Sequence, residues 1–280
     1  MARNERAQWA RLDFDGVALL ADLAAGASLA RVLDFEAAAP LRCFGAPAAA
    51  SVPLEVGDFN GRVIRGASCN CSVLTLTPHA NGTHTESVGH LTIERLDIHS
   101  LIPQRLLLAC LMTVEAELAA DSRESSRPAP RPSDLLITRA QLESAWSEAP
   151  APRLSARAAV IRTQPNDADK YARERALAPF LSADAATLLV ERGIEHLVLD
   201  VPSADRMSDG GALTAHRIFF GLPAGSTELA QARRRACTIT ELAYIADTIA
   251  DGWYLLALHA PAIGGDAVPS RPMLYPLRAP

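Results

Sequence analysis

The chain has 280 residues, an apolar fraction of 49% and a charged fraction of 21%. These are ordinary globular values, and they exclude a disordered, collagen-like or coiled-coil chain. The 32 acidic residues outnumber the 27 basic ones, which gives a net charge of −5 and argues against a surface that grips nucleic-acid phosphates. We expect one domain over residues 1–280 that acts on a small molecule.

The cysteines and the apolar segments of the sequence indicate in which cellular compartment the protein is found. Five cysteines at irregular spacing do not form a disulfide framework, and an odd number leaves a free thiol, as in a reducing compartment. Cys69 and Cys71 lack the second pair of a zinc ribbon, so two residues on one face of a strand are favoured over a metal site. The apolar stretch from Gly16 to Leu33 is interrupted by charges and fits neither a secretory signal nor a membrane span. We therefore expect a soluble, cytoplasmic protein with no membrane partner.

The first half of the chain begins with alanine-rich segments, which predict helix and then loop over residues 1–50. Residues 72–77 alternate β-branched and apolar side chains and predict a strand. Residues 106–115 form a continuous apolar run that fits a buried strand or a buried helix. The β-branched pair Thr113-Val114 favours the strand.

Residues 120–134 are polar and rich in proline and serine, so they predict a surface loop, with a lid as the alternative. Thr138 and Gln141 have the spacing of a capping box, which predicts a short helix through Trp146.

The second half alternates strands and helices. Residues 159–163 predict a strand, Ser182 caps a helix that stops at Gly193, and residues 196–200 predict the next strand. This order is that of a crossover unit in an α/β sheet. Two further strand-like runs are residues 237–241 and 253–259.

A histidine cluster carries the chemistry of the chain. Four of the seven histidines fall within 21 residues, and residues 79–90 read HANGTHTESVGH. Imidazoles with an interleaved carboxylate suit a divalent metal. His84 and Glu86 are two apart, so both point to one side of an extended backbone. The alternative is that these histidines are exposed at a turn or bind backbone groups.

The histidine-rich segment resembles the first signature of the metal-dependent cyclase family, His-x-Gly-Thr-His-x-Asp-x-Pro-x-His, which includes kynurenine formamidases (arylformamidases) and isatin hydrolases. Gly82, Thr83, His84, Glu86 and His90 fall in register with it. A second family block, His-Arg followed by a glutamate on a strand, is similar to His216-Arg217 and Glu241 here. Residues 257–271 are similar to the closing glycine-rich turn with its Pro-x-Arg, and the resemblance covers roughly residues 50–277.

The first block departs from the family at three positions. The first family histidine would fall at Ala80, and His79 stands one place earlier. The family aspartate is Glu86 and the family proline is Val88. On a strand, a slip of one residue turns a side chain to the other face, so His79 is kept as a further ligand whose reach the structure must show.

The resemblance implies a site and a reaction. His84, Glu86, His216 and Glu241 would bind the metal, with His79 as an additional ligand, and His90 would be the acid/base histidine. The implied reaction is hydrolysis of an amide C–N bond by metal-activated water. The implied substrate is N-formylkynurenine or a related aryl formamide or cyclic amide, with a lactone as an alternative. Zinc is the expected metal and manganese the alternative.

The implied fold is α/β, with a cyclase-family mixed β-sheet core of the swivelling β/β/α type and flanking helices. The family association also implies a homo-oligomer, dimer or tetramer. The alternative function is a non-catalytic or altered-specificity protein of the same fold that binds or assembles. A serine hydrolase is disfavoured because no Gly-x-Ser-x-Gly elbow occurs, and a dinucleotide oxidoreductase because no Gly-x-Gly-x-x-Gly follows a strand.

Two groups of residues carry weaker signals. The polar residues before His216 fit either partners that orient this histidine or a solvated loop; they are Asp200, Ser203, Asp205, Arg206 and Asp209. An aromatic substrate would need aromatic side chains, for which core packing is the alternative; the candidates are Phe44, Phe59, Phe219, Phe220 and Trp253.

Overall fold

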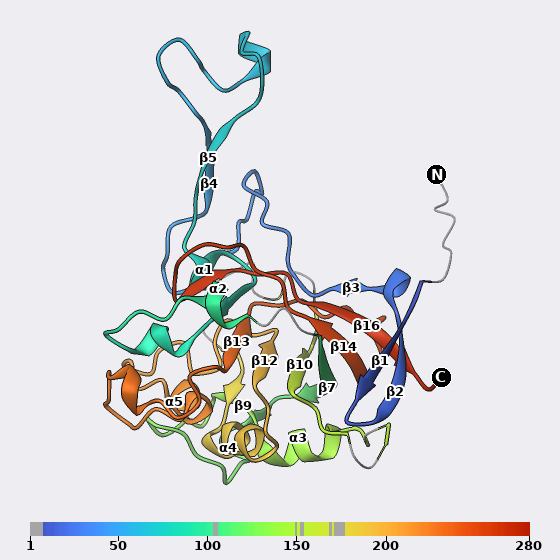
Figure 1. The fold of residues 1–280 in the computed structure, drawn as a ribbon. Helices are drawn as coiled ribbons and strands as arrows, with labels where there is room; N and C mark the ends of the chain where they lie inside the picture. Colours follow the sequence, from blue (N-terminus) through green and yellow to red (C-terminus); the bar gives the residue numbers. More distant parts are fainter. Residues whose placement is uncertain (1–7, 103–105, 149, 152–153, 168–169, 171–176) are drawn as a thin grey trace.

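A computed structural model describes residues 8–102, 106–148, 150–151, 154–167, 170 and 177–280. One large mixed sheet runs through the described part of the chain (Figure 1). Its strands in spatial order are β1 (Trp9–Phe14), β2 (Val17–Asp22), β16 (Met273–Arg278), β14 (Gly252–Ala257), β7 (Leu107–Glu115), β10 (Ala158–Gln164), β12 (His196–Leu199), β13 (Thr238–Glu241), β6 (His84–Glu86) and β15 (Ala267–Pro269). The short strand β3 (Ala27–Ser28) also pairs with β16.

The centre of this sheet is parallel and buried on both faces. β7, β10, β12 and β13 pair in parallel, and β10 is joined to β12 through α4 (Ala183–Glu191), which confirms the predicted crossover unit. Ser182 caps α4 by accepting a hydrogen bond from the Ala185 N–H, and Gly193 ends it at a φ of 72°. Because both faces are covered, β7 is an apolar run rather than an alternating strand, which confirms the strand prediction for residues 106–115.

The remaining helices and small sheets lie around this centre. The helices are α1 (Pro78–Asn81), α2 (Ile98–Leu101), α3 (Arg139–Ala145) and α5 (Thr214–Phe220), with 3₁₀ turns at Leu23–Ala25, Val63–Arg65, Val88–Leu91 and Leu229–Gln231. A small sheet has the order β11 (Phe180–Leu181), β9 (Leu135–Ile137), β8 (Glu117–Leu118). Residues 120–134 form a largely exposed loop between β8 and β9, and both bonds of the capping box predicted at Thr138 are present in α3. No helix in the described ranges has the length and apolarity to cross a membrane.

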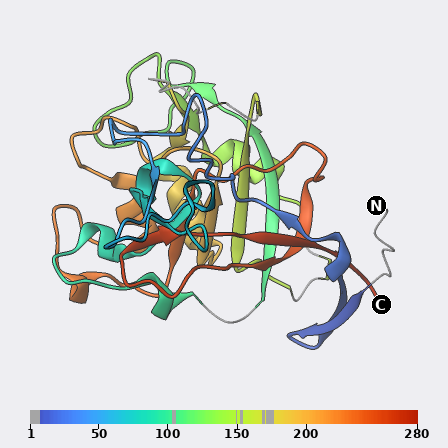
Figure 2. The ribbon, with the colours of Figure 1, turned by 90° about the horizontal axis from the view of Figure 1, so that it is seen from above.

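The helix predicted within residues 1–50 is wrong over the described residues, which begin at residue 8, whereas the loop predicted after it is present over residues 29–49. Described residues 8–28 form the hairpin β1–β2 and strand β3, and the hairpin lies at the opposite end of the sheet from β6 (Figure 2). Asp15 and Gly16 both have positive φ, of 52° and 81°, as the two central residues of a type I′ turn require. An Asp-Gly pair between apolar alternations is a hairpin signal, and here it outweighs the helix propensity of the alanines.

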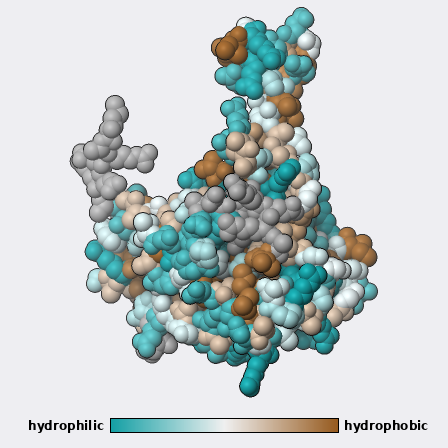
Figure 3. All heavy atoms as spheres, turned by 180° about the vertical axis from the view of Figure 1, so that it is seen from behind, coloured by the Kyte–Doolittle hydropathy of each residue, from teal (hydrophilic) through white to brown (hydrophobic). Residues whose placement is uncertain are grey.

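Residues 50–75 form an arm that projects from the body of the molecule (Figure 1). It begins and ends with the antiparallel pair β4 (Ala50–Pro53) and β5 (Ser72–Thr75), so the strand predicted from residue 72 is confirmed. Six large aliphatic side chains on the arm are exposed, and apolar residues are visible along it in Figure 3; they are Val52, Val56, Val63, Ile64, Val73 and Leu74. Cys69 and Cys71 are free thiols in the loop before β5, so their predicted placement on one strand is wrong.

Candidate metal centre

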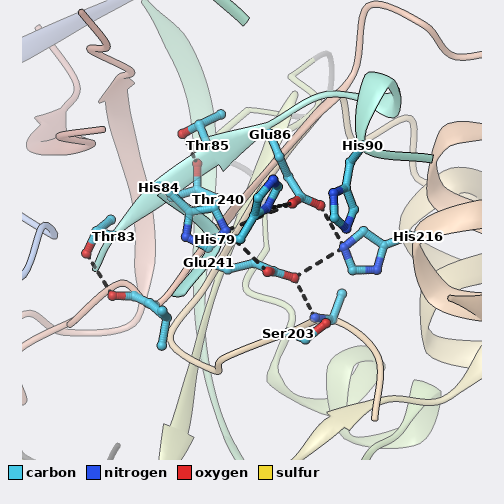
Figure 4. A network of polar contacts seen from close by, with 12 residues as sticks. His79, Thr83, His84, Thr85, Glu86, His90, Ser203, His216, Thr240 and Glu241 are labelled. Atoms are coloured by element: carbon cyan, nitrogen blue, oxygen red, sulfur yellow. Dashed lines mark hydrogen bonds and ion pairs between the residues drawn. The ribbon is translucent and has the colours of Figure 1, made fainter. Parts of the chain in front are cut away.

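Strands β6 and β13 place three of the predicted ligands. The two strands pair antiparallel with Glu241 opposite His84, and both ends of the pair are buried. His84 and Glu86 alternate with Thr85, so they share a face of β6, whereas the Thr85 hydroxyl bonds the Thr240 hydroxyl at 2.7 Å. Figure 4 shows the carboxylates of Glu86 and Glu241 and the ring of His84 converging.

Helix α5 supplies His216 from the other side of the centre. Asp205 fixes the start of this helix by accepting hydrogen bonds from the backbone N–H groups of Ala215 and His216. The same carboxylate lies 2.7 Å from His216 Nδ1. One buried side chain therefore sets both the helix end and the orientation of the imidazole, as carboxylates behind metal-binding histidines do.

The ring nitrogens of His84 and His216 have defined roles. His84 Nδ1 lies 3.0 Å from the Gly82 carbonyl oxygen, which can only accept, so Nδ1 carries the proton. His216 Nδ1 carries its proton toward Asp205 for the same reason. In both rings the other nitrogen, Nε2, faces the glutamates and is the atom that could bind a metal.

Three acceptor groups lie close enough together to hold a metal, and the Nε2 atom of a fourth, His216, contacts both glutamates. We name these four residues the His/Glu cluster: His84, Glu86, His216 and Glu241. His216 Nε2 lies 2.7 Å from Glu86 Oε1 and 3.4 Å from Glu241 Oε1. His84 Nε2 lies 3.5 Å from Glu241 Oε2 and has no hydrogen-bond partner among the described residues. Lone pairs directed at carboxylates repel each other unless positive charge lies between them. The buried, partnerless Nε2 atom and this donor set fit a divalent cation.

The ionisation of the cluster shows the same demand for positive charge, which a proton on His216 meets when no cation is bound. Burial lowers the pKa of His216, but Glu86, Asp205 and Glu241 more than offset it and raise that pKa well above its usual value. Burial raises the pKa of Glu86, yet His90 and His216 bring it well below its usual range. The glutamates of the cluster are thus charged, and a divalent cation would neutralise them.

His79 reaches the centre from α1, despite its offset in the sequence. Pro78 begins this single helical turn, so successive side chains are separated by about 100° rather than alternating between two faces. His79 Nδ1 lies 2.9 Å from Glu86 Oε2, and its Nε2 lies 3.1 Å from Asp266 Oδ2. Burial lowers the pKa of His79, but Asp266 and Glu86 raise it to about 10.

His90 stands on the solvent side of the centre. It belongs to the 3₁₀ turn after β6, its side chain is 31% exposed, and its Nδ1 lies 3.6 Å from Asp266 Oδ2. His79, Glu86 and His90 form one group close enough to hold a metal, and His84, Glu86 and Glu241 form another, so Glu86 is common to both groups. The structure therefore brings together all six predicted site residues; they are His79, His84, Glu86, His90, His216 and Glu241.

Sequence reasoning missed the role of Asp266, which precedes β15 and contacts two histidines of the site. Asp266 lies within residues 257–271, the segment that resembles the closing turn of the family, and this was the available signal. The contact with His79 depends on the pairing of β15 with β6, which the sequence does not show. Of the polar residues before His216, Asp205 contacts the site, whereas Asp200 bonds Thr163 on β10. Asp209 bonds the backbone at Leu213 instead.

Left-handed backbone occurs beside several elements of the site. Leu242, directly after Glu241, has a φ of 54°, and Leu213, which begins α5, has a φ of 47°. Phe44, in a turn whose backbone bonds α1, has a φ of 58°. Such conformations are unfavourable for these residue types and persist where the surrounding structure fixes them.

The fold and the cluster agree with a comparison against family models, in which residues 24–206 match the model of the Cyclase family, described as "Putative cyclase". The chain belongs to the Cyclase family. The matched segment contains the first block of the site and Asp205, whereas His216 and Glu241 lie beyond its end.

Solved structures share the fold of this Cyclase-family chain at low sequence identity. A predicted metal-dependent hydrolase from Bacillus stearothermophilus is 15% identical, with a TM-score of 0.55, and the match covers 89% of this chain and 97% of that one. Isatin hydrolase A from Labrenzia aggregata, bound to benzyl benzoate, is 14% identical, with a TM-score of 0.56 and coverage of 89% and 93%. A third similar structure, described as a novel cyclase, is 12% identical, with a TM-score of 0.58 and coverage of 90% and 86%. No curated protein sequence matches the chain.

Proposed function

We propose that the chain is a metal-dependent hydrolase that cleaves an amide C–N bond in an aryl formamide or a related cyclic amide. The observation that carries this proposal is the convergence of two imidazole lone pairs and two carboxylates in the buried His/Glu cluster. Membership of the Cyclase family and the fold shared with proteins named metal-dependent hydrolase and isatin hydrolase support it. Isatin itself contains an aromatic ring and a cyclic amide, which resembles the bond we propose.

The His/Glu cluster would hold the cation. Two imidazoles with two carboxylates suit zinc, which takes nitrogen and oxygen ligands and can expand to five-coordinate to admit a water, better than manganese, which favours oxygen. When bound, a divalent cation polarises a carbonyl and lowers the pKa of a water ligand far below that of bulk water, toward about 7. Asp205 holds His216 in the tautomer that this role requires.

His90 would move the proton. Asp266 near its Nδ1 favours a proton on that atom and leaves Nε2 to accept one from the attacking water. As the C–O bond forms and the C–N bond breaks, His90 Nε2 would deliver this proton to the departing nitrogen, giving formate and an amine from a formamide. Such acid/base catalysis typically contributes a factor of about 10² to 10⁴ in rate.

The test combines metal content with hydrolysis of N-formylkynurenine, isatin and a simple lactone. His84→Ala is expected to lose the metal and all hydrolysis, because His84 Nε2 is a buried ligand. His90→Ala is expected to keep the metal and lose about 10²-fold or more in kcat. His99→Ala, an exposed histidine on α2, serves as the matched control and is expected to change neither.

Three outcomes would count against the proposal. A His84→Ala protein with full metal content refutes the ligand assignment. An unchanged kcat in His90→Ala removes the acid/base role. If metal-loaded protein hydrolyses the lactone but neither N-formylkynurenine nor isatin, the substrate class is an ester and not an amide.

A further inference from the structure

Helix α5 has two faces with different surroundings. His216, Phe219 and Phe220 are buried toward the core and the His/Glu cluster. Thr214, Arg217 and Ile218 lie on the other side, together with Gly221 just after the helix, and they line a separate cavity of about 750 Å³. The spacing of this second set, three, four and seven residues from Thr214, is that of one helix face. No residue of the His/Glu cluster lines the cavity.

The lining of the cavity is positively charged, although the Asp184 carboxylate accepts a hydrogen bond from the N–H of its lining residue Ser125 at 3.3 Å. Arg127, Arg217 and Arg233 line it, and no aspartate or glutamate is among its lining residues, in a chain whose net charge is −5. No ion pair within the described ranges involves these arginines. The guanidinium of Arg217 donates to the backbone carbonyls of Ala212, Pro223 and Ser226, which keep it in place without neutralising it.

The rest of the lining is small or apolar. Ile218, Leu222 and Pro223 form apolar wall, and the side chains of Ser125 and Ser126 add hydroxyl groups. Thr214 donates from its hydroxyl to the Arg127 carbonyl at 2.8 Å, which joins the loop on one side of the cavity to α5 on the other. The cavity is thus built from two segments that hydrogen bonds connect.

We propose that this cavity is a second ligand site, separate from the metal centre, which takes a small carboxylate with an apolar body. Its volume lies in the range of about 300–1,000 Å³ typical of small-molecule sites. Guanidinium groups bind carboxylates through paired, charge-assisted hydrogen bonds, and the apolar wall accommodates the remainder of the ligand. The proposal is independent of the hydrolase function, because it requires neither the metal nor its ligands.

The test uses isothermal titration calorimetry with two probes, 4-phenylbutyrate and its uncharged amide, 4-phenylbutyramide. The carboxylate is expected to bind one per chain and at least about tenfold more tightly than the amide, because only the acid offers a negative charge to the arginines. The double variant Arg127→Gln/Arg233→Gln is expected to weaken binding of the carboxylate about tenfold or more. Arg235→Gln, an exposed neighbour outside the cavity, is the matched control and is expected to leave binding unchanged.

Two further variants separate this site from the metal centre and from effects on folding. Ala224→Trp fills the cavity from an exposed position and is expected to abolish binding with the arginines intact. Glu86→Gln, in the His/Glu cluster, is expected to bind 4-phenylbutyrate as the parent does. Equal binding of acid and amide, no effect of the double variant and of Ala224→Trp, loss of binding in Glu86→Gln, or no binding at about 10 mM probe would each overturn the proposal.

Discussion

In the His/Glu cluster, ionisable side chains are buried, whereas on the arm of residues 50–75 large aliphatic side chains are exposed. In the cluster, each buried group faces another charged group, and Asp205 and the Gly82 carbonyl fix the rings from behind. On the arm, all four residues of β5 are exposed. The two departures from ordinary burial have different meanings: the buried ionisable groups fit a cation, whereas the exposed aliphatic groups bury little area, so we expect the arm to contribute little to the stability of the body.

The largest expected effect is a loss of metal affinity when a carboxylate of the His/Glu cluster is changed, with a carboxylate of the arm as the control. Glu86→Gln removes a charge common to both candidate metal groups, so we expect metal affinity to fall by about 100-fold or more and hydrolysis with it. Glu55→Gln on the arm removes an acid that is 70% exposed and 3.9 Å from Arg65, and no change is expected. For both variants, metal content after dialysis reports metal affinity, and the rate of N-formylkynurenine hydrolysis reports activity. Equal metal content in the two variants would contradict the comparison.

The next largest effect on metal affinity is expected from Asp205, whose carboxylate holds the His216 ring in place. Asp205→Asn cannot hold His216 as the charged carboxylate does, so we expect metal affinity to fall by about 10- to 100-fold. Asp209→Asn is the matched control, because within the described part of the chain Asp209 bonds backbone N–H groups of the loop before α5, at Gly211 and Leu213, and not His216. Competition with a chromogenic chelator measures the affinities. If both variants lose affinity alike, Asp205 acts through the loop rather than through the ring.

A smaller effect is expected in the turn formed by Cys43, Phe44, Gly45 and Ala46, which lies against α1. The Cys43 N–H bonds the Ala80 carbonyl, and Phe44 and Gly45 both have positive φ, of 58° and 68°. Glycine adopts this conformation without strain, so Phe44→Gly is expected to raise the free energy of unfolding by about 0.5–1 kcal/mol. Gly45→Ala is expected to lower it by about 1 kcal/mol, because a Cβ there meets no atom within 4 Å and only backbone strain is added.

Urea unfolding of the two variants measures these opposite shifts. A loss of stability in Phe44→Gly would mean that the aromatic ring contributes packing that exceeds the backbone strain. In that case the turn would belong with the tightly packed cluster rather than with the exposed arm.

The smallest effect is expected at the tip of the arm. Ile64 is 94% exposed, so Ile64→Ser removes almost no buried area and should change the free energy of unfolding by less than about 0.5 kcal/mol. Thermal unfolding of the full-length protein checks this. A decrease of several degrees in the melting temperature of Ile64→Ser would show that the arm is packed in solution. The contrast between a buried His/Glu cluster and an exposed arm would then be wrong.

Sequence reasoning placed the elements whose signals are local. The capping box at Thr138 and the apolar run of β7 are read from neighbouring residues, and both were predicted correctly. The Asp15-Gly16 hairpin was missed because alanine content outweighed a two-residue turn signal. The partners of the site were only partly within reach. Asp205 was one of five candidates for orienting His216, and chain spacing does not tell which of them contacts the ring. The role of Asp266 was missed because it depends on a contact with His79 that only the fold creates.

The central claim is that two imidazoles and two carboxylates of this chain share one cation. X-ray absorption spectroscopy at the zinc edge of zinc-loaded protein tests it most directly. We predict a five-coordinate first shell of nitrogen and oxygen at about 2.0–2.2 Å, made of the four side chains and one water, with the imidazole contribution halved in His216→Ala. A first shell that contains sulfur at about 2.3 Å, or one that is the same in His216→Ala, would contradict the account.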